Sequence, residues 1–169
     1  ITSPASIAWL FNIRGGDVSR TPLPLGRAFL FSDGQAELFL HPSKIGSELG
    51  AHLGNEVALR PANEMERRMS KLQGKRVSVD PSMASSWFFG ALSKAGAETV
   101  RQQDPVMLPR AKKNNVEVEG ARKAHRRDGA ALSRFLRWFE ANGQTGEVTE
   151  IDAAKKVEEF REATGRSEE

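Results

Sequence analysis

The chain contains no cysteine. This absence excludes disulfide bonds, thiolate metal sites and cysteine nucleophiles together, and it predicts a reducing cytoplasmic location. Long apolar runs are missing as well. None approaches the ~20 residues that a membrane-spanning helix needs, so we expect no membrane partner. The first four residues, ITSP, include neither a basic segment nor an initiator methionine, which indicates a piece of a longer protein rather than a secretory signal.

The familiar short catalytic motifs are also missing. The sequence has no His-Glu-x-x-His, no Gly-Lys-Ser/Thr, no G-x-G-x-x-G and no G-x-S-x-G. His41 and His52 stand apart from any carboxylate pattern, so each is interpreted as a surface histidine. We therefore assign no catalytic residue and no metal ligand to this chain.

The chain carries only a slight excess of positive charge. The 169 residues include 25 Lys and Arg against 22 Asp and Glu, a net charge of +3. The basic residues concentrate in 110–127, where Glu117 and Glu119 interleave with them and no aromatic residues alternate with them. Stacking on nucleic acid bases would require such aromatics, so a solvated helix face is favoured and no nucleic acid partner is expected. A stand-alone basic binding module remains an alternative.

The first hundred residues alternate short strand-like and helical segments. Apolar runs at 27–31 and 36–40 flank an Asp-Gly turn, which predicts a β-hairpin. A helix beginning at Ser6 should precede it, with Trp9 in the core, and Trp87 should be a second core residue. The further predicted segments are helices at 43–53, 63–72 and 82–95 and strands at 57–60, 76–80 and 98–102. This order predicts an α/β fold with a mixed β-sheet flanked by helices.

The remainder is purely helical. Two Pro-containing pairs at 104–109 mark a linker, so the predicted domains are 1–108 and 109–169. Helices are predicted at 114–140 and 151–163, each with one apolar stripe. Two one-sided stripes do not make a domain, so they should pack on each other, on the first domain or on a second copy, which leaves a homodimer open. His125 extends the first stripe, and Asp128 lies within its reach. His125 is therefore interpreted either as a residue near a catalytic pocket or as a buried histidine joining two helices.

Several stretches together resemble one family. Residues 8–15 (AWLFNIRG), 38–40 (LFL), 111–120 (AKKNNVEVEG), 124–131 (AHRRDGAA) and 149–161 occur in the order and spacing of the long, three-domain Xaa-Pro aminopeptidases (aminopeptidase P). Each motif alone is weak, but the ordered set covers nearly the whole chain. The resemblance implies a creatinase N-terminal-like middle domain at 1–108, followed by the first helices of a pita-bread catalytic domain.

The resemblance also implies an activity for the parent protein. Members of the family are hydrolases that remove the N-terminal residue from peptides with proline in second position. They use two divalent metal ions, usually manganese, which activate a water molecule. The family's metal ligands lie beyond the second helix and its N-terminal domain precedes Ile1, so this chain alone is expected to be an inactive scaffold. Its partners would be those missing domains. Asn12 and Arg14 are candidate interdomain residues, although Arg14 could instead cap local carbonyls.

Three alternatives stay open beside this interpretation. The parent could be a non-catalytic pita-bread relative that has lost its ligands. It could be a creatinase or a proline dipeptidase, although these usually have a single N-terminal domain and lack the character of residues 112–125. The basic binding module is the third.

Overall fold

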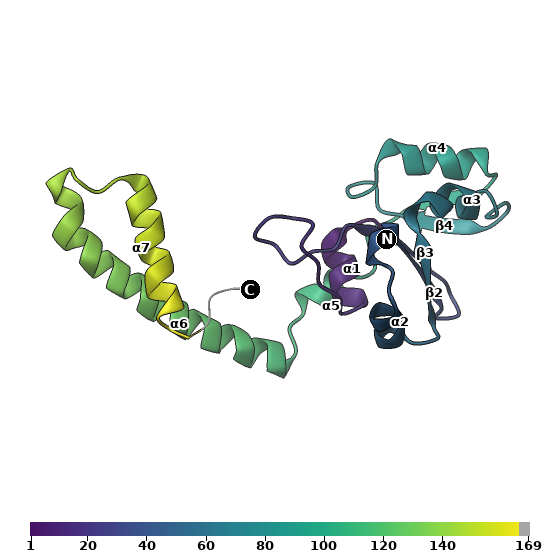
Figure 1. Ribbon diagram of the computed structural model, residues 1–169. Coiled ribbons are helices and arrows are strands. Elements are labelled where there is room, and N and C mark those ends of the chain that lie inside the picture. Colours follow the sequence, from purple (N-terminus) through teal and green to yellow (C-terminus); the bar gives the residue numbers. More distant parts are fainter. Residues whose placement is uncertain (166–169) are drawn as a thin grey trace. The chain divides into compact units, whose positions relative to one another are not determined.

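The computed structural model describes residues 1–165. The chain divides into two compact units, Ile1–Lys112 and the helical residues from Lys113 onward. The predicted α/β fold with two long helices after it is confirmed (Figure 1).

The first unit places a three-stranded sheet between two helical layers. β1 (Gly26–Leu30) pairs antiparallel with β2 (Ala36–Leu40), and β2 pairs parallel with β3 (Val57–Pro61). α1 (Pro4–Leu10) and α2 (Ser47–Leu53) cover one face of the sheet. α3 (Met65–Met69) and α4 (Ser86–Lys94) cover the other. The short helices η1 (Pro42–Lys44) and η2 (Ala62–Glu64) lead into α2 and α3.

All five residues of β2 are buried, because helices cover both of its faces. Leu38 and Leu40 pack with Ile7 and Phe11 of the α1 segment, in the first core cluster. Phe39 points the other way and packs with Met69 and its neighbours in the second. Strict alternation along the strand therefore produces two separate apolar cores, one on each side of the sheet.

A second, two-stranded sheet differs from the single sheet that the sequence predicts. β4 (Arg76–Val79) pairs parallel with β5 (Glu98–Arg101), and neither strand belongs to the first sheet. The predicted strands 76–80 and 98–102 are themselves confirmed, each ending one residue earlier in the structure. The helices predicted at 43–53 and 82–95 begin later than expected, at Ser47 and Ser86. The prediction of a single mixed sheet is therefore wrong in how the strands group, whereas the number of strands and the α/β class are as predicted.

Three local predictions are wrong. α1 begins after Ser3, not Ser6, because Pro4 suits the first helical position and the Ser3 hydroxyl accepts the Ser6 N–H at 3.4 Å. Trp9 and Trp87 are 40% and 47% exposed, since the inward faces of their helices carry Ile7 and Leu92 instead. A short helix, α5 (Met107–Ala111), occupies part of the predicted linker.

The second unit is a helical hairpin. α6 (Asn115–Asn142) and α7 (Glu150–Glu162) are joined by η3 (Gly143–Thr145), and both begin with a capping box, at Asn114 and Thr149. Ala131 is fully buried between the helices, whereas Leu132, Leu136 and Phe139 are 41 to 57% exposed. The two stripes thus meet only in part, and much of the α6 stripe remains uncovered within the hairpin.

No helix in residues 1–165 is long and apolar enough to cross a membrane.

Candidate functional site

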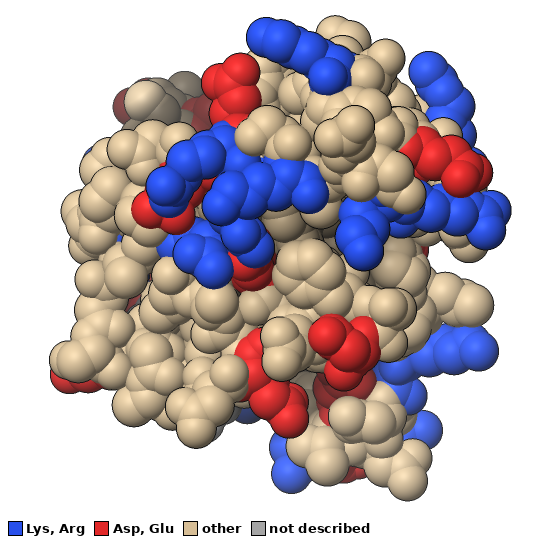
Figure 2. All heavy atoms as spheres, turned by 90° about the vertical axis from the view of Figure 1, so that its right-hand side faces the viewer, with Lys and Arg blue, Asp and Glu red and all other residues tan. Residues whose placement is uncertain are grey.

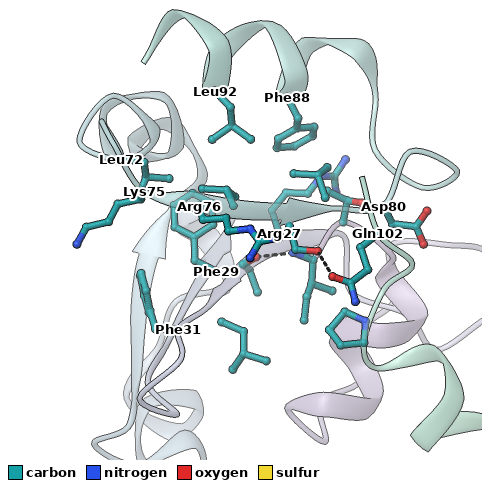
Figure 3. A pocket seen from close by; sticks show the side chains of 18 of the residues that line it. Arg27, Phe29, Phe31, Leu72, Lys75, Arg76, Asp80, Phe88, Leu92 and Gln102 are labelled. Carbon is teal, nitrogen blue, oxygen red and sulfur yellow. Dashed lines mark hydrogen bonds between the residues drawn. The ribbon is translucent and has the colours of Figure 1, made fainter. Parts of the chain in front are cut away.

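A cavity of the first unit lies between its two sheets. This inter-sheet cavity has a volume of about 680 Å³. It is lined by β1 with the turn after it, by β4, by the inward face of α4, and by residues 1–2, Met69, Leu72, Gln102, Asp104 and Pro105. In Figure 3, Phe88 and Leu92 of α4 lie above it, and Phe29 and Phe31 lie below. The lining is chiefly apolar, with charged side chains at its margin.

The carboxylate of Asp80, directly after β4, is fully engaged in holding the local backbone. Asp80 accepts hydrogen bonds from the Ser82 hydroxyl at 2.6 Å, the Ser82 N–H at 2.8 Å and the Asp104 N–H at 2.9 Å. The hydroxyl bond first, and the two N–H bonds after it, hold the pKa of Asp80 below its ordinary value. An ionised carboxylate bound in this way fixes a loop and is not available as a proton donor near neutral pH.

Asn12 and Arg14 lie on the turn that follows α1. Asn12 is exposed and has a left-handed backbone with φ of 49°. The Arg14 guanidinium donates to the carbonyls of Ala8 at 3.2 Å and Ile13 at 3.0 Å. Arg14 therefore caps local carbonyls, as the alternative interpretation predicted, and a contact with another domain remains a prediction for both residues.

His125 is exposed on α6, and its Nδ1 lies 2.8 Å from the Ala121 carbonyl of the same helix. Asp128, which the sequence offered as its partner, instead accepts from Arg161 of α7 at 2.8 Å. The structure thus brings Asp128 and Arg161 together. The interpretation of His125 as a buried residue joining two helices is wrong, because His125 is exposed and bonded within its own helix. A position of His125 near a catalytic pocket stays a prediction. His41 and His52 are both exposed, so the prediction of surface histidines is confirmed.

A buried ionic cluster was missed by the sequence analysis. Glu37 of β2 is only 5% exposed. Its carboxylate accepts a hydrogen bond from Arg68 of α3, with Nε to Oε2 at 2.9 Å, and forms an ion pair with Arg60 of β3 at 2.9 Å. The Glu37 hydrogen bond holds the pKa of Arg68 above its ordinary value. The signal was a glutamate at an inward position of an otherwise apolar strand. The cluster ties β2, β3 and α3 together, which is a structural role.

The described residues do not fit a metal centre. In residues 1–165, no three His, Asp or Glu side chains are close enough together to hold an ion, and the chain has no cysteine. No reaction step is therefore derived through a metal on these residues.

The face shown in Figure 2 carries Lys and Arg side chains with Asp and Glu among and below them, so both signs of charge share it.

Comparisons with known proteins identify the family of the chain. Residues 1–117 match the model of the Creatinase/Prolidase N-terminal domain. Probable Xaa-Pro aminopeptidases P from Leptosphaeria maculans and Aspergillus fumigatus are each 36% identical over 92% of the chain. The chain spans 27% and 25% of their lengths, about a quarter.

Solved structures share the fold of the chain. An X-prolyl aminopeptidase from Caenorhabditis elegans, described as a cytosolic enzyme with a di-nuclear active site, matches 94% of the chain and 27% of its own with a TM-score of 0.78 at 25% identity. A prolidase from Pyrococcus horikoshii shares the fold at 17% identity, over 95% of this chain and 42% of its own, with a TM-score of 0.54. The chain is a member of the Creatinase/Prolidase N-terminal domain family. Its resemblance to aminopeptidase P is confirmed.

Proposed function

We propose that the chain is the middle domain and the first catalytic-domain helices of a Xaa-Pro aminopeptidase. The parent would remove the N-terminal residue from peptides with proline in second position. One observation carries this proposal: the 36% identity extends over 166 residues and therefore through both units rather than the family domain alone. Residues 1–108 would be the middle domain and 109–169 the linker and the start of the pita-bread domain.

In this proposal the chain is a scaffold. It offers no metal-binding cluster in its described part, so two divalent ions, which we propose to be manganese, would be held by residues of the parent outside this stretch. The di-nuclear site and cytosolic origin of the Caenorhabditis elegans protein support the metal requirement and a cytoplasmic location. The exposed α6 stripe, with Leu136 57% and Phe139 43% exposed, supports coverage by the rest of the catalytic domain or by a second copy in a homodimer.

The test compares the full-length parent with the isolated chain. We expect the purified parent to release the first residue from an Arg-Pro-Pro peptide with added manganese, to lose that activity with a chelator, and to recover it on readdition. The isolated chain should be inactive and should retain no manganese after gel filtration. Cleavage by the isolated chain would contradict the scaffold role.

The same assay separates the rival functions. A folded parent that binds no metal and cleaves nothing would be a non-catalytic relative. Binding of the isolated chain to nucleic acid that weakens steeply with salt would instead indicate a basic binding module, because phosphate contacts depend on counterion release.

A further inference from the structure

The two helices of the second unit differ in charge. Residues 120–139 of α6 include six Lys and Arg residues but a single acidic residue, Asp128. α7 has the opposite balance, with five Asp and Glu residues against three Lys and Arg residues. The hairpin therefore separates the two signs of charge and concentrates the positive one on α6.

Five of the six basic residues share one side of α6. At about 100° per residue, they fall within about 120° of the helix circumference and extend over about 22 Å of its length. All five are exposed. We call this set the basic face: Arg122, Lys123, Arg126, Arg134 and Arg137.

Only the two ends of the basic face carry ion pairs. Arg122 lies 4.0 Å from Glu119, and Arg137 lies 3.4 Å from Glu140. Exposed pairs of this kind contribute little, so they neutralise the face only in part. In residues 1–165 the three basic residues of its middle form no ion pair: Lys123, Arg126 and Arg134.

The basic face points away from the other two sides of α6. α7 meets the side that carries Asp128 and Ala131, since Asp128 accepts from Arg161 at 2.8 Å and Ala131 is fully buried. The uncovered apolar stripe lies on another side. The centre of the basic face is more than about 110° around the helix from Ala131 and from the stripe. A partner that covers the stripe therefore leaves the basic face open.

We propose that the basic face binds the anionic surface of a lipid bilayer, with α6 lying along the plane of the membrane. Roughly four to eight Lys and Arg residues on an amphipathic helix are typical of such a contact, and each raises partitioning about fivefold. A helix that lies on a bilayer needs no membrane-spanning segment, so we revise the expectation of no membrane partner for this one face. The peptidase activity proposed for the parent is not required.

The shape and composition of the basic face favour a bilayer over nucleic acid. Its long side chains, fanned over about 120°, can all bend toward one flat surface. A DNA duplex is itself convex, so a convex helix face would reach few of its phosphates from outside a groove. The positions between the basic residues on this side are Ala130 and Ser133, so no aromatic residue is available to stack on the bases of a single strand.

The experiment measures how the 169-residue chain sediments with sucrose-loaded vesicles of phosphatidylcholine, with or without about 30% phosphatidylserine. At about 50 mM salt we expect about a hundredfold tighter partitioning onto the vesicles with phosphatidylserine, since the three basic residues in the middle of the face act together. At about 500 mM salt most of this gain should disappear, because salt screens the charges.

A pair of variants tests the face itself. Arg126→Gln/Arg134→Gln should lower partitioning onto the phosphatidylserine vesicles about 25-fold, whereas Arg126→Lys/Arg134→Lys, which keeps both charges, should stay within about threefold of the wild type. Gln and Lys form helices about as well as Arg, and circular dichroism checks that the hairpin is retained. Lys71→Gln/Lys94→Gln is the matched control, because it removes two exposed charges from the first unit. It should change partitioning less than about twofold.

Four results would overturn the proposal. Partitioning that is equal on both kinds of vesicle, or absent from both, would leave the basic face without a role. Equal losses in the Gln variant and its control would assign binding to net charge alone. Tighter binding to a DNA duplex than to the vesicles in the same buffer would assign the face to nucleic acid. A full-length parent that does not sediment with the phosphatidylserine vesicles, although the isolated chain does, would show that the parent covers the face. The peptidase assay on that parent is independent, so either proposal can fail without the other.

Discussion

Replacing Glu37 by glutamine should destabilise the first unit severely. The substitution keeps the shape of the side chain and removes its charge. Two guanidinium groups, Arg60 and Arg68, then lose their common carboxylate while 70% or more of each side chain stays buried. The Arg60 Nε is already buried without a hydrogen-bond partner in the described part of the chain, and Glu64, the other carboxylate beside Arg60, is 3.7 Å away, beyond hydrogen-bonding distance.

The magnitude follows from the burial of the three side chains. Removing one partner of a fully buried ion pair costs about 3–5 kcal/mol. Because 30% of Arg60 and 27% of Arg68 remain exposed, water takes up part of that loss, and we expect about 2–3 kcal/mol. With an m-value of about 1.5–2 kcal/mol/M, the urea midpoint should fall by about 1–2 M.

Urea unfolding followed by tryptophan fluorescence measures this effect. A Trp138→Phe background leaves Trp9 and Trp87 as reporters, both in the first unit. Glu98→Gln is the matched control, because the Arg76–Glu98 pair is 3.5 Å long and both side chains are at least 70% exposed. That control should change stability by less than about 0.5 kcal/mol. If Glu37→Gln were as mild as Glu98→Gln, the assignment of Glu37 as the pivot of the cluster would be refuted.

Further predictions concern the acid response, a helix cap and the core. The lowered pKa of Asp80 stabilises the fold at pH values above its ordinary 3.8, and this contribution disappears as the pH falls through the lowered pKa. The urea midpoint should therefore drop more between pH 5 and pH 2.5 in the wild type than in Asp80→Asn, and parallel profiles would disprove it. Asn114→Ala should cost the hairpin about 1 kcal/mol in thermal unfolding followed by circular dichroism, and an equal loss in Asn115→Ala would argue against the capping box. Ile7→Ala should cost about 2–5 kcal/mol because Ile7 is fully buried, which urea unfolding would contradict if the loss were below 1 kcal/mol.

Local structure followed closely from local sequence. The Asp-Gly turn between two apolar runs predicted the hairpin of β1 and β2, and the structure has this hairpin. The long helix and the one after it were predicted to within about two residues, because their caps and periodicity are properties of neighbouring residues. The start of α1 was misplaced since both Ser3 and Ser6 can cap, and the choice depended on Pro4.

Contacts between distant residues were beyond the sequence. Glu37 meets Arg68 across 31 residues, and nothing near either residue shows that α3 will cross β2 at that point. Trp9 and Trp87 were expected in the core because of their size, but a helix buries whichever face the sheet meets. His125 and Asp128 are close in the sequence, yet Asp128 pairs with Arg161 on the neighbouring helix.

The sequence by itself determined the segments, their class and the family resemblance, because these depend on periodicity, turn residues and ordered motifs. The tertiary structure alone decided how the strands group. β1 and β4 line one cavity although they are far apart in the sequence, and each of them is hydrogen-bonded only to strands of its own sheet. Side-chain patterns predict where a strand lies, but backbone groups are the same in every residue, so only the folded chain shows which edges remain unpaired.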